Sequence, residues 1–349
     1  MEHLRILHKL PDALLPWYRL NRRELPWRSD REPYHVWLSE IMLQQTRVEA
    51  VKGYYARFLS ALPTVEALAN CDDDVLHKLW EGLGYYSRVR NLKKAAQVIV
   101  NQHGGAFPGD YAAVRALPGI GDYTAGAICS ICYDHPTPAV DGNVLRVISR
   151  ILDDAAPIDL QATKKRVAAD LAEIYPKDAG DFTQSLMELG ATVCGPNKRP
   201  DCENCPCNAF CKGFQRGTAE SLPVKSPKKE RREEDLTVFI LSCEGSVLLR
   251  QRPKKGLLAG LWEVPNVSGH LSEQEALETV ESMGLRPREL LRMVERSHIF
   301  THIRWNMRGY YIEVASAEEN GDWFTREQVQ LQAALPTAFR QFWEEKQDV

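Results

Sequence analysis

The stretch LPGIGDYTAG, residues 117–126, decides the fold of the N-terminal part of the chain. A hydrophobic segment ends where it begins, Pro118 cannot continue a helix, and Gly119 and Gly121 permit backbone conformations that a side chain would forbid. A new helix is expected to begin near Asp122, and its first amide groups have no partners within the helix. Together with the helix dipole, these amides form a site for an anion such as a phosphate. The stretch therefore predicts a phosphate-binding turn between two helices, with an ordinary interhelical turn as the alternative for so short a motif.

Length and composition indicate a protein of two domains. The chain has 349 residues, 44% of them hydrophobic, and a net charge of only -3. A core of this size favours two domains over one, and the near-neutral charge means that any nucleic-acid binding depends on local geometry. The N-terminal segment contains no apolar stretch long enough for a signal peptide or a membrane span. We therefore expect a soluble, cytoplasmic protein that contacts no membrane.

The hydrophobic pattern changes along the chain. Residues 1–213 carry apolar side chains at the three- and four-residue spacing of helices. Residues 214–235 are polar, highly charged and punctuated by proline, which is typical of a linker. Residues 236–349 begin with LTVFILSCEGSVLLRQR, two strand-like runs joined at Glu244 and Gly245, and continue with mixed strand and helix patterns. This predicts an all-α domain, a linker and an α+β domain.

Cysteines gather in the loop 194–211. The candidate ligands are Cys194, Cys202, Cys205 and Cys211. Such clustering in an intracellular protein favours metal or cluster ligation over disulfides. Zinc and an iron-sulfur cluster both accept four thiolates, so the spacing does not choose between them. Cys207 also lies in this loop and is expected to pack or to face solvent, although it could replace a neighbour.

Two carboxylates lie in helical contexts that suit acid chemistry. In HVWLSEIMLQQTRVEAV, Trp37 and Ile41 mark an apolar face on which Glu40 also lies. Burial would raise the pKa of Glu40 and let it hold a proton near neutral pH, as a general acid requires, whereas a boundary glutamate would reach solvent. Asp141 precedes an amphipathic helix, and by default it is an N-cap. Glu40 and Asp141 can act as a catalytic pair of carboxylates only if the fold brings them together.

The order of LPGIGDYTAG, VDGN and the four-cysteine loop resembles the helix-hairpin-helix DNA glycosylase superfamily that carries an iron-sulfur cluster. With LPWR at 25–28, SEIMLQQT at 39–46, GLGYYSR at 82–88 and the appended domain, the chain is similar to the adenine DNA glycosylase (MutY) family over nearly its whole length. The resemblance implies a two-lobed helical domain with the active site between the lobes. It also implies a [4Fe-4S] cluster on the four cysteines and a Nudix-like C-terminal domain that recognises 8-oxoguanine.

The function implied is that of a monofunctional adenine DNA glycosylase. Such an enzyme hydrolyses the N-glycosidic bond of adenine opposite 8-oxoguanine or guanine in double-stranded DNA and leaves an abasic site. Tyr123 stands where lyase-competent relatives such as endonuclease III carry a lysine, and tyrosine cannot form the Schiff base of strand cleavage. We expect a monomer in a bacterial-type cytoplasm, held at the nucleoid by DNA. The alternatives are an endonuclease III-like glycosylase and lyase, a non-catalytic iron-sulfur DNA-binding protein, and a Nudix hydrolase.

The resemblance also assigns roles to individual residues. Glu40 matches the acid that protonates adenine at N7, and Asp141 matches the carboxylate that stabilises the oxocarbenium-like sugar, with Tyr123 and Asn143 in support. The matches to the adenine pocket are Trp27, Arg28 and Gln184. Tyr85 matches the tyrosine that wedges into the duplex, and the matches around the opposite 8-oxoguanine are Gln45, Thr46 and Leu83. The matches to the phosphate-binding turn and the 8-oxoguanine loop are Gly119, Gly121, Phe300, Thr301 and His302.

The chain departs from the family pattern in the C-terminal domain. Aligning Gly284 with the glycine that follows the acidic residues of the Nudix box places Glu278 and Glu281 at acid positions, but Leu277 replaces the arginine and Ser282 a glutamate. Pyrophosphatase activity is therefore not expected.

Three smaller departures concern recognition and ligation. Thr301 replaces the family serine but keeps the hydroxyl, and without the family His302 would be read as a core histidine. The first cysteine gap is one residue longer than usual. Leu145 stands where some relatives carry a DNA-binding lysine.

Overall fold

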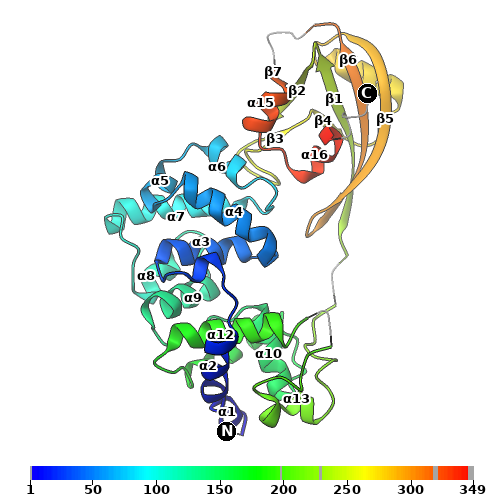
Figure 1. Cartoon of the computed structure of the whole chain (residues 1–349). Helices are drawn as coiled ribbons and strands as arrows, with labels where there is room; N and C mark the ends of the chain where they lie inside the picture. Colours follow the sequence, from blue (N-terminus) through cyan, green and yellow to red (C-terminus); the bar gives the residue numbers. More distant parts are fainter. Residues whose placement is uncertain (1, 197–198, 228–229, 317–320, 345–349) are drawn as a thin grey trace. The chain divides into compact units, whose positions relative to one another are not determined.

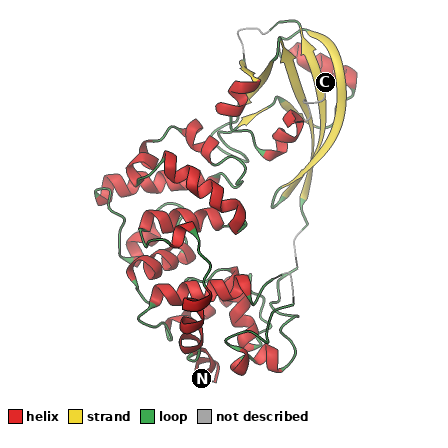
Figure 2. Ribbon diagram, viewed as in Figure 1, coloured by secondary structure: helices red, strands yellow, loops and turns green. Residues whose placement is uncertain are grey.

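The computed structural model describes residues 2–196, 199–227, 230–316 and 321–344. Its packing divides the chain into two compact units, Met1–Asn70 with Arg90–Pro227 and Cys71–Val89 with Lys228–Val349. The first unit is built of helices, whereas the strands belong to the second (Figures 1 and 2). The predicted fold class, an all-α part followed by an α+β part, is confirmed.

Short helices joined by tight turns make up the first unit. They are α1 (Glu2–Leu7), α2 (Leu10–Asn21), η1 (Pro26–Arg28), α3 (Pro33–Leu43), α4 (Val48–Ala61), α5 (Val65–Asn70), α7 (Ser87–His103), α8 (Tyr111–Ala116), α9 (Asp122–Tyr133), α10 (Gly142–Leu152), α11 (Gln161–Ala172), α12 (Ala179–Thr192), η2 (Asn208–Phe210) and α13 (Lys212–Gln215), with α7 starting in the second unit. Within the described ranges, no helix is long and apolar enough to cross a bilayer.

The helices of the first unit form two lobes. In one lobe α3 packs against α4 and α9, and α8 packs against α9. In the other, α10 packs against α12, and α12 against α2. Val144, Val147, Ile148 and Ile151 recur along α10 at helical spacing, and all four enter the core of the second lobe. The lobes meet where α12 contacts α9.

The turn between α8 and α9 has the shape that its glycines predict. Gly119 has a φ of 78°, and a Cβ atom there would lie 2.5 Å from the Cβ of Asn91 on α7. Both the left-handed conformation and the crowding exclude a side chain at this position. Leu117 and Ile120 are each 3% exposed and anchor the turn in the core. The turn is therefore held rigidly at the start of α9.

The second unit is built around a mixed sheet. Its strands are β1 (Arg232–Cys243), β2 (Ser246–Gln251), β3 (Trp262–Glu263), β4 (Asn266–Ser268), β5 (Pro287–Ile299), β6 (Ile303–Val314) and β7 (Asp322–Thr325), and its helices are α6 (Asp73–Leu79), α14 (Glu273–Ser282), α15 (Arg326–Leu331) and α16 (Thr337–Glu344). The strand order is β3-β2-β1-β6-β5, with β4 added to β1 and β7 to β2. β1 and β6 are parallel, whereas the other pairs are antiparallel.

Alternate residues of β1 enter two different cores. Val238 and Ile240 face a cluster that includes Phe339 of α16, whereas Phe239 and Leu241 face a cluster that includes Ala276 of α14. Because successive side chains of a strand point to opposite faces, both faces of the sheet are buried by helices. This explains the continuous apolar run of β1.

Candidate active site

A cleft of about 1400 Å³ lies between the lobes of the first unit. It is lined by η1, α3, the turn before α9 and the starts of α10 and α11, together with α12. The structure brings these predicted site residues to the cleft: Trp27, Arg28, Glu40, Gln45, Thr46, Gly119, Gly121, Tyr123, Asp141, Asn143 and Gln184. The predicted residues Leu83, Tyr85, Phe300, Thr301 and His302 belong to the second unit instead.

Glu40 is a buried acid. It is 6% exposed because α3 packs against both α4 and α9. Its carboxyl group therefore does not reach solvent, and the alternative of a boundary glutamate is wrong. The pKa of Glu40 is raised to about 7, and burial is the largest cause. The hydrogen bond from Tyr123 and the charge of Arg28 act in the opposite direction, whereas the charge of Asp141 adds to the increase. A large fraction of Glu40 is therefore protonated at neutral pH and can still release the proton.

Tyr123 holds the Glu40 carboxyl in place. It lies in the first turn of α9, and its hydroxyl donates a hydrogen bond to Oε2 of Glu40. Burial, and then the charges of Glu40 and Asp141, raise the pKa of Tyr123 well above its ordinary value. Tyr123 therefore remains protonated and acts as a donor. The predicted phosphate-binding turn and the hydrogen-bond donor to the acid thus lie in one short segment.

Asp141 combines the role of an N-cap with that of a second carboxylate. Its Oδ1 accepts from the amide of Val144 at 2.7 Å, which caps α10, and its Oδ2 accepts from Nδ2 of Asn143 at 2.7 Å. Burial raises the pKa of Asp141, although both hydrogen bonds favour the charged form. The charge of Asp141 also acts on Glu40, so the fold places the two carboxylates in one electrostatic environment. Asp141 is thus the N-cap expected from the sequence, and its charge also acts on Glu40.

Besides Glu40 and Asp141, the cleft is lined by a fully buried carboxylate, Glu188, which sequence reasoning missed. Glu188 lies on α12 and is 0% exposed. Its Oε1 accepts from Nε and the amide of Arg23 at 2.7 and 3.1 Å, and its Oε2 accepts from Arg23 Nη2 at 3.0 Å and Arg28 Nη2 at 2.8 Å. The run SLMELG contains an acidic residue among apolar ones, and this pattern could have indicated the site. A carboxylate on a buried helix needs hydrogen-bond donors or a positive charge beside it.

Trp27, Gln184 and Gln45 are further predicted site residues that line the cleft. Trp27 is 6% exposed and packs edge to face on Tyr55, with ring centroids 5.5 Å apart. Gln184 lies one helical turn before Glu188 on the same helix. Gln45 follows α3 with a φ of 59°, a left-handed conformation that is strained for a non-glycine residue. Backbone strain of this kind is concentrated at functional sites.

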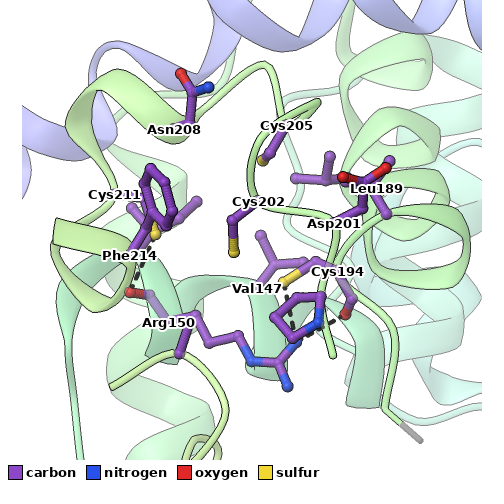
Figure 3. Close-up of a pocket in the computed structure, with 14 residues that line it drawn as sticks. Val147, Arg150, Leu189, Cys194, Asp201, Cys202, Cys205, Asn208, Cys211 and Phe214 are labelled. Carbon is purple, nitrogen blue, oxygen red and sulfur yellow. Dashed lines mark hydrogen bonds between the residues drawn. The ribbon is translucent and has the colours of Figure 1, made fainter. Parts of the chain in front are cut away.

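The four candidate cysteine ligands line one small cavity. It is enclosed by Cys194, Cys202, Cys205 and Cys211 together with apolar side chains of α10, α12 and α13 (Figure 3). Among the residues that the structure describes, no group of three or more His, Cys, Asp and Glu side chains is arranged to hold a single metal ion. Cys207 is 0% exposed and belongs to the core of the second lobe, so it packs and does not face solvent.

Two buried arginines of α10, also missed from the sequence, connect the cysteine loop with the cleft. Arg150 Nη1 lies 3.2 Å from the Cys194 sulfur and 3.1 Å from its carbonyl oxygen. Arg146 Nε donates to the Cys194 carbonyl at 2.8 Å, and its Nη2 donates to Oδ1 of Asn143 at 2.8 Å. Since Asn143 donates to Asp141, hydrogen bonds run without a break from the cysteine loop to the cleft carboxylate.

In the second unit, the structure brings two predicted DNA contacts together. The hydroxyl groups of Tyr85 and Thr301 lie 2.7 Å apart, although 216 residues separate them in sequence. Tyr85 is 49% exposed with a φ of 47°, and Leu83 is buried. Thr301 and His302 are exposed in the turn between β5 and β6, so His302 is not a core histidine.

Phe300 anchors this turn through its ring. The centroid of the Phe300 ring lies 4.8 Å from that of Trp305. The Nudix-like helix α14 presents Glu278 and Glu281 to solvent, whereas Leu277 packs on the core. An apolar contact thus occupies the position where the Nudix box requires an arginine.

Comparisons with known proteins identify relatives of both units. Residues 38–177 match the family described as HhH-GPD superfamily base excision DNA repair protein, and residues 237–345 match the NUDIX domain family. The adenine DNA glycosylase of Mus musculus is 36% identical over 395 residues, which cover 94% of this chain and 76% of that protein. The adenine DNA glycosylase of Buchnera aphidicola subsp. Acyrthosiphon pisum is 32% identical over 292 residues, covering 83% of this chain and 82% of that protein.

Solved structures resemble the helical part of the chain. A thermostable thymine-DNA glycosylase superposes with a TM-score of 0.55 and 28% sequence identity, over 62% of this chain and 98% of that one. A trapped covalent intermediate of endonuclease III with DNA superposes with a TM-score of 0.53 and 21% identity, over 62% of this chain and 99% of that one. This second similarity supports the fold alone.

Proposed function

Because the chain belongs to the adenine DNA glycosylases, helix-hairpin-helix enzymes of base excision repair, we propose that it removes adenine mispaired with 8-oxoguanine or guanine. The substrate is double-stranded DNA, and the product is an abasic site. The observation that carries this proposal is the arrangement of two carboxylates in one cleft, with Glu40 holding a pKa of about 7 beside Asp141. Two carboxyl groups in different environments can act as acid and as charge stabiliser in one reaction.

The reaction begins with protonation of the base. The Glu40 carboxyl transfers its proton to N7 of adenine, and the bond between the sugar C1′ and N9 breaks with its electron pair moving to the base. Positive charge then develops on the sugar, and the Asp141 carboxylate stabilises it. The Glu40 carboxylate next accepts a proton from a water molecule as that water attacks C1′. The net reaction is hydrolysis of the N-glycosidic bond.

The other residues of the cleft bind and orient the substrate. Trp27, Arg28 and Gln184 line the adenine pocket, while Tyr123 and Asn143 hold the two carboxyl groups. The turn at Gly119 and Gly121 contacts a DNA phosphate through the first amides of α9, a twelve-residue helix that no side chain caps. Gln45 and Thr46 contact the opposite base.

The second unit reads the oxidised guanine. Thr301 and His302 are exposed, polar and placed at a hairpin turn, while Tyr85 supplies a wedge that fills the space left by the flipped adenine. Leu83 lies beside the opposite base. Flipping a base costs a few kcal/mol, which such contacts offset. Leu277 in place of the Nudix arginine argues against pyrophosphatase activity in this unit.

The cysteine loop holds a [4Fe-4S] cluster. Zinc would require the four thiolates around a single ion, at about 2.3 Å each. The four thiols line one cavity, which supports their joint ligation of a cluster whose cysteines bind separate iron atoms. When bound, the cluster would stabilise the fold of the loop. Iron and sulfide analysis tests this: loss of iron in C202S with retention in C207S is expected, and a zinc-loaded protein would overturn the assignment.

Single-turnover assays test the function. End-labelled duplexes carry adenine opposite 8-oxoguanine, guanine or thymine, and each is analysed with and without alkali. Breakage only after alkali, confined to the two mispairs, is expected. Breakage without alkali would show lyase activity, and intact strands with retained binding would show a non-catalytic DNA-binding protein. Because DNA is the substrate, we place the enzyme in the cytoplasm with the nucleoid, and a monomer is expected in sedimentation.

A further inference from the structure

The charged group Glu188, Arg23 and Arg28 has no part in the chemical steps above. Glu188 is 0% exposed, and the four hydrogen bonds of its carboxylate all come from the two arginines. A fully buried carboxylate is costly unless its oxygens are satisfied, and here each oxygen accepts two N–H groups. The arginines are 37% and 14% exposed at their side chains, and both reach the cleft. The buried carboxylate therefore holds two partly open guanidinium groups.

Arg28 is fixed by further contacts. Its Nη1 donates to the carbonyl oxygen of Arg23 at 3.2 Å, and its guanidinium carbon lies 5.7 Å from the ring centroid of Tyr18. Since a guanidinium has five N–H donors, these contacts orient the group and leave donors for a base in the cleft. Arg23 lies between α2 and η1, and Arg28 is the last residue of η1, so Glu188 attaches this part of the chain to α12.

We propose that Glu188 is a positioning residue for adenine excision, which holds Arg28 and Arg23 at the wall of the base pocket and offsets the charge that Arg28 exerts on Glu40. The inference rests on the proposed function. Glu188 does not touch the reacting atoms in this proposal and acts through Arg28.

The charge of Arg28 explains why a partner is needed. Glu40 must hold a proton, and a nearby cation favours the deprotonated form. Arg28 lowers the pKa of Glu40, against burial and Asp141, which raise it. An ionised Glu188 beside Arg28 weakens that effect. The burial of Glu188 opposes its ionisation, but the hydrogen bonds and charges of Arg23 and Arg28 prevail and keep its pKa below the ordinary value.

Other titratable groups also lie near Glu40 and Glu188. Tyr123 and Cys132 of α9 and Asp141 at the start of α10 interact with Glu40. Tyr18 of α2 feels the charge of Glu188. Among the groups that act on Glu40, only Arg28 carries a positive charge, while Arg23 pairs with Glu188 itself. Removing the charge of Glu188 would therefore act on Glu40 in one direction only, toward a lower pKa.

The experiment compares full-length wild-type protein with E188Q, E188D and the control D178N. Asp178 pairs with Arg19 at 2.6 Å just before α12, and both side chains are more than half exposed, so this variant breaks an ion pair outside the pocket. The single-turnover rate on adenine opposite 8-oxoguanine is measured over roughly pH 6 to 9, on both sides of the Glu40 pKa. Rates are normalised to active sites by titration with substrate duplex.

For E188Q we expect a rate at least about tenfold lower at neutral pH, and an alkaline decline that begins about half a pH unit lower or more. E188D keeps the charge on a shorter side chain, so its rate should fall while its pH profile stays in place. D178N should match the wild type in both respects. Duplex binding should change less than the rate in every variant.

A wild-type rate in E188Q would overturn the inference. So would a fall by the same factor at every pH, which a merely structural role predicts. Should E188Q fail to fold, E188D decides, because an unchanged rate there excludes a positioning role. If the wild-type protein itself removes no adenine, the proposed function fails, and that result is distinct from all of these.

Discussion

The cleft of the first unit and the β5–β6 turn of the second unit both carry predicted DNA contacts, but they are built in opposite ways. In the cleft, Glu40 and Glu188 are buried and held by hydrogen bonds from other helices. At the turn, Thr301 and His302 are exposed, and the observed partner of Thr301 is the exposed Tyr85. One region removes charged groups from water, whereas the other presents polar groups to it.

This difference reflects two kinds of task. Acid catalysis needs a carboxyl whose pKa departs from its ordinary value, and burial is the largest cause of that departure for Glu40. Reading an opposite base needs donors and acceptors that can exchange water for DNA, so exposure is an advantage there. Variants in the cleft should therefore change the rate of excision, and variants at the turn should change the choice between mispairs.

The largest effect is expected for E40Q. Glutamine fills the same space but cannot give a proton to the base, so excision should slow on the order of 10³-fold or more. Duplex binding should be retained, and single-turnover assays with parallel binding titrations would measure both. The control is E49Q, since the Glu49 side chain is 80% exposed on α4. Excision by E40Q within about tenfold of wild type would remove Glu40 from the role of acid.

D141N is expected to slow excision by about 10²-fold. Asparagine caps a helix about as well as aspartate, so α10 should remain folded while the negative charge near the sugar is lost. Thermal denaturation should show little change, and the single-turnover rate should carry the effect. An unchanged rate would reduce Asp141 to the N-cap of the default reading.

The pH profile of Y123F should move in the direction opposite to that of E188Q. The Tyr123 hydroxyl favours the charged form of Glu40, so its removal raises the Glu40 pKa above about 7. The protonated acid then persists to higher pH. A shift of about one unit would change the rate up to about tenfold on the alkaline side. A profile displaced to lower pH would contradict the observed hydrogen-bond direction.

The smallest effect is expected at the exposed turn. T301A removes one hydroxyl, and a single hydrogen bond contributes about 1 kcal/mol, so the preference for 8-oxoguanine over guanine should fall about fivefold. The excision rate on the guanine mispair should stay close to wild type. T301S keeps the hydroxyl and should keep the preference, and S297A removes an exposed hydroxyl from β5 as a control. An equal loss of excision rate on both mispairs would contradict the view that the turn sets the choice between mispairs and the cleft sets the rate.

Local patterns predicted the elements, whereas for Glu40 they left a buried position and a boundary position open. The apolar face marked by Trp37 and Ile41 places Glu40 toward the core, and the structure has all three residues buried on α3. The change from helical to strand spacing near residue 236 predicted the fold class, which is confirmed. Such signals lie within a few residues of the feature that they predict.

Partners distant in sequence could not be predicted in this way. Glu188 lies 165 residues from Arg23, so nothing near either residue indicates the contact. The pairing of Tyr85 with Thr301 spans 216 residues and includes the short segment that packs with the second unit. The roles that the family resemblance attaches to the site residues remain predictions until the variants above are measured.

The parallel pairing of β1 with β6 has a consequence for synthesis on the ribosome. β1 pairs with β6 from Arg232 to Ser242, yet its partner begins only at Ile303. Until those later residues leave the exit tunnel, one edge of an apolar strand has no neighbour, and unpaired edges promote aggregation. A nascent chain that pauses before Ile303 should therefore need a chaperone, whereas the helices of the first unit have by then been made.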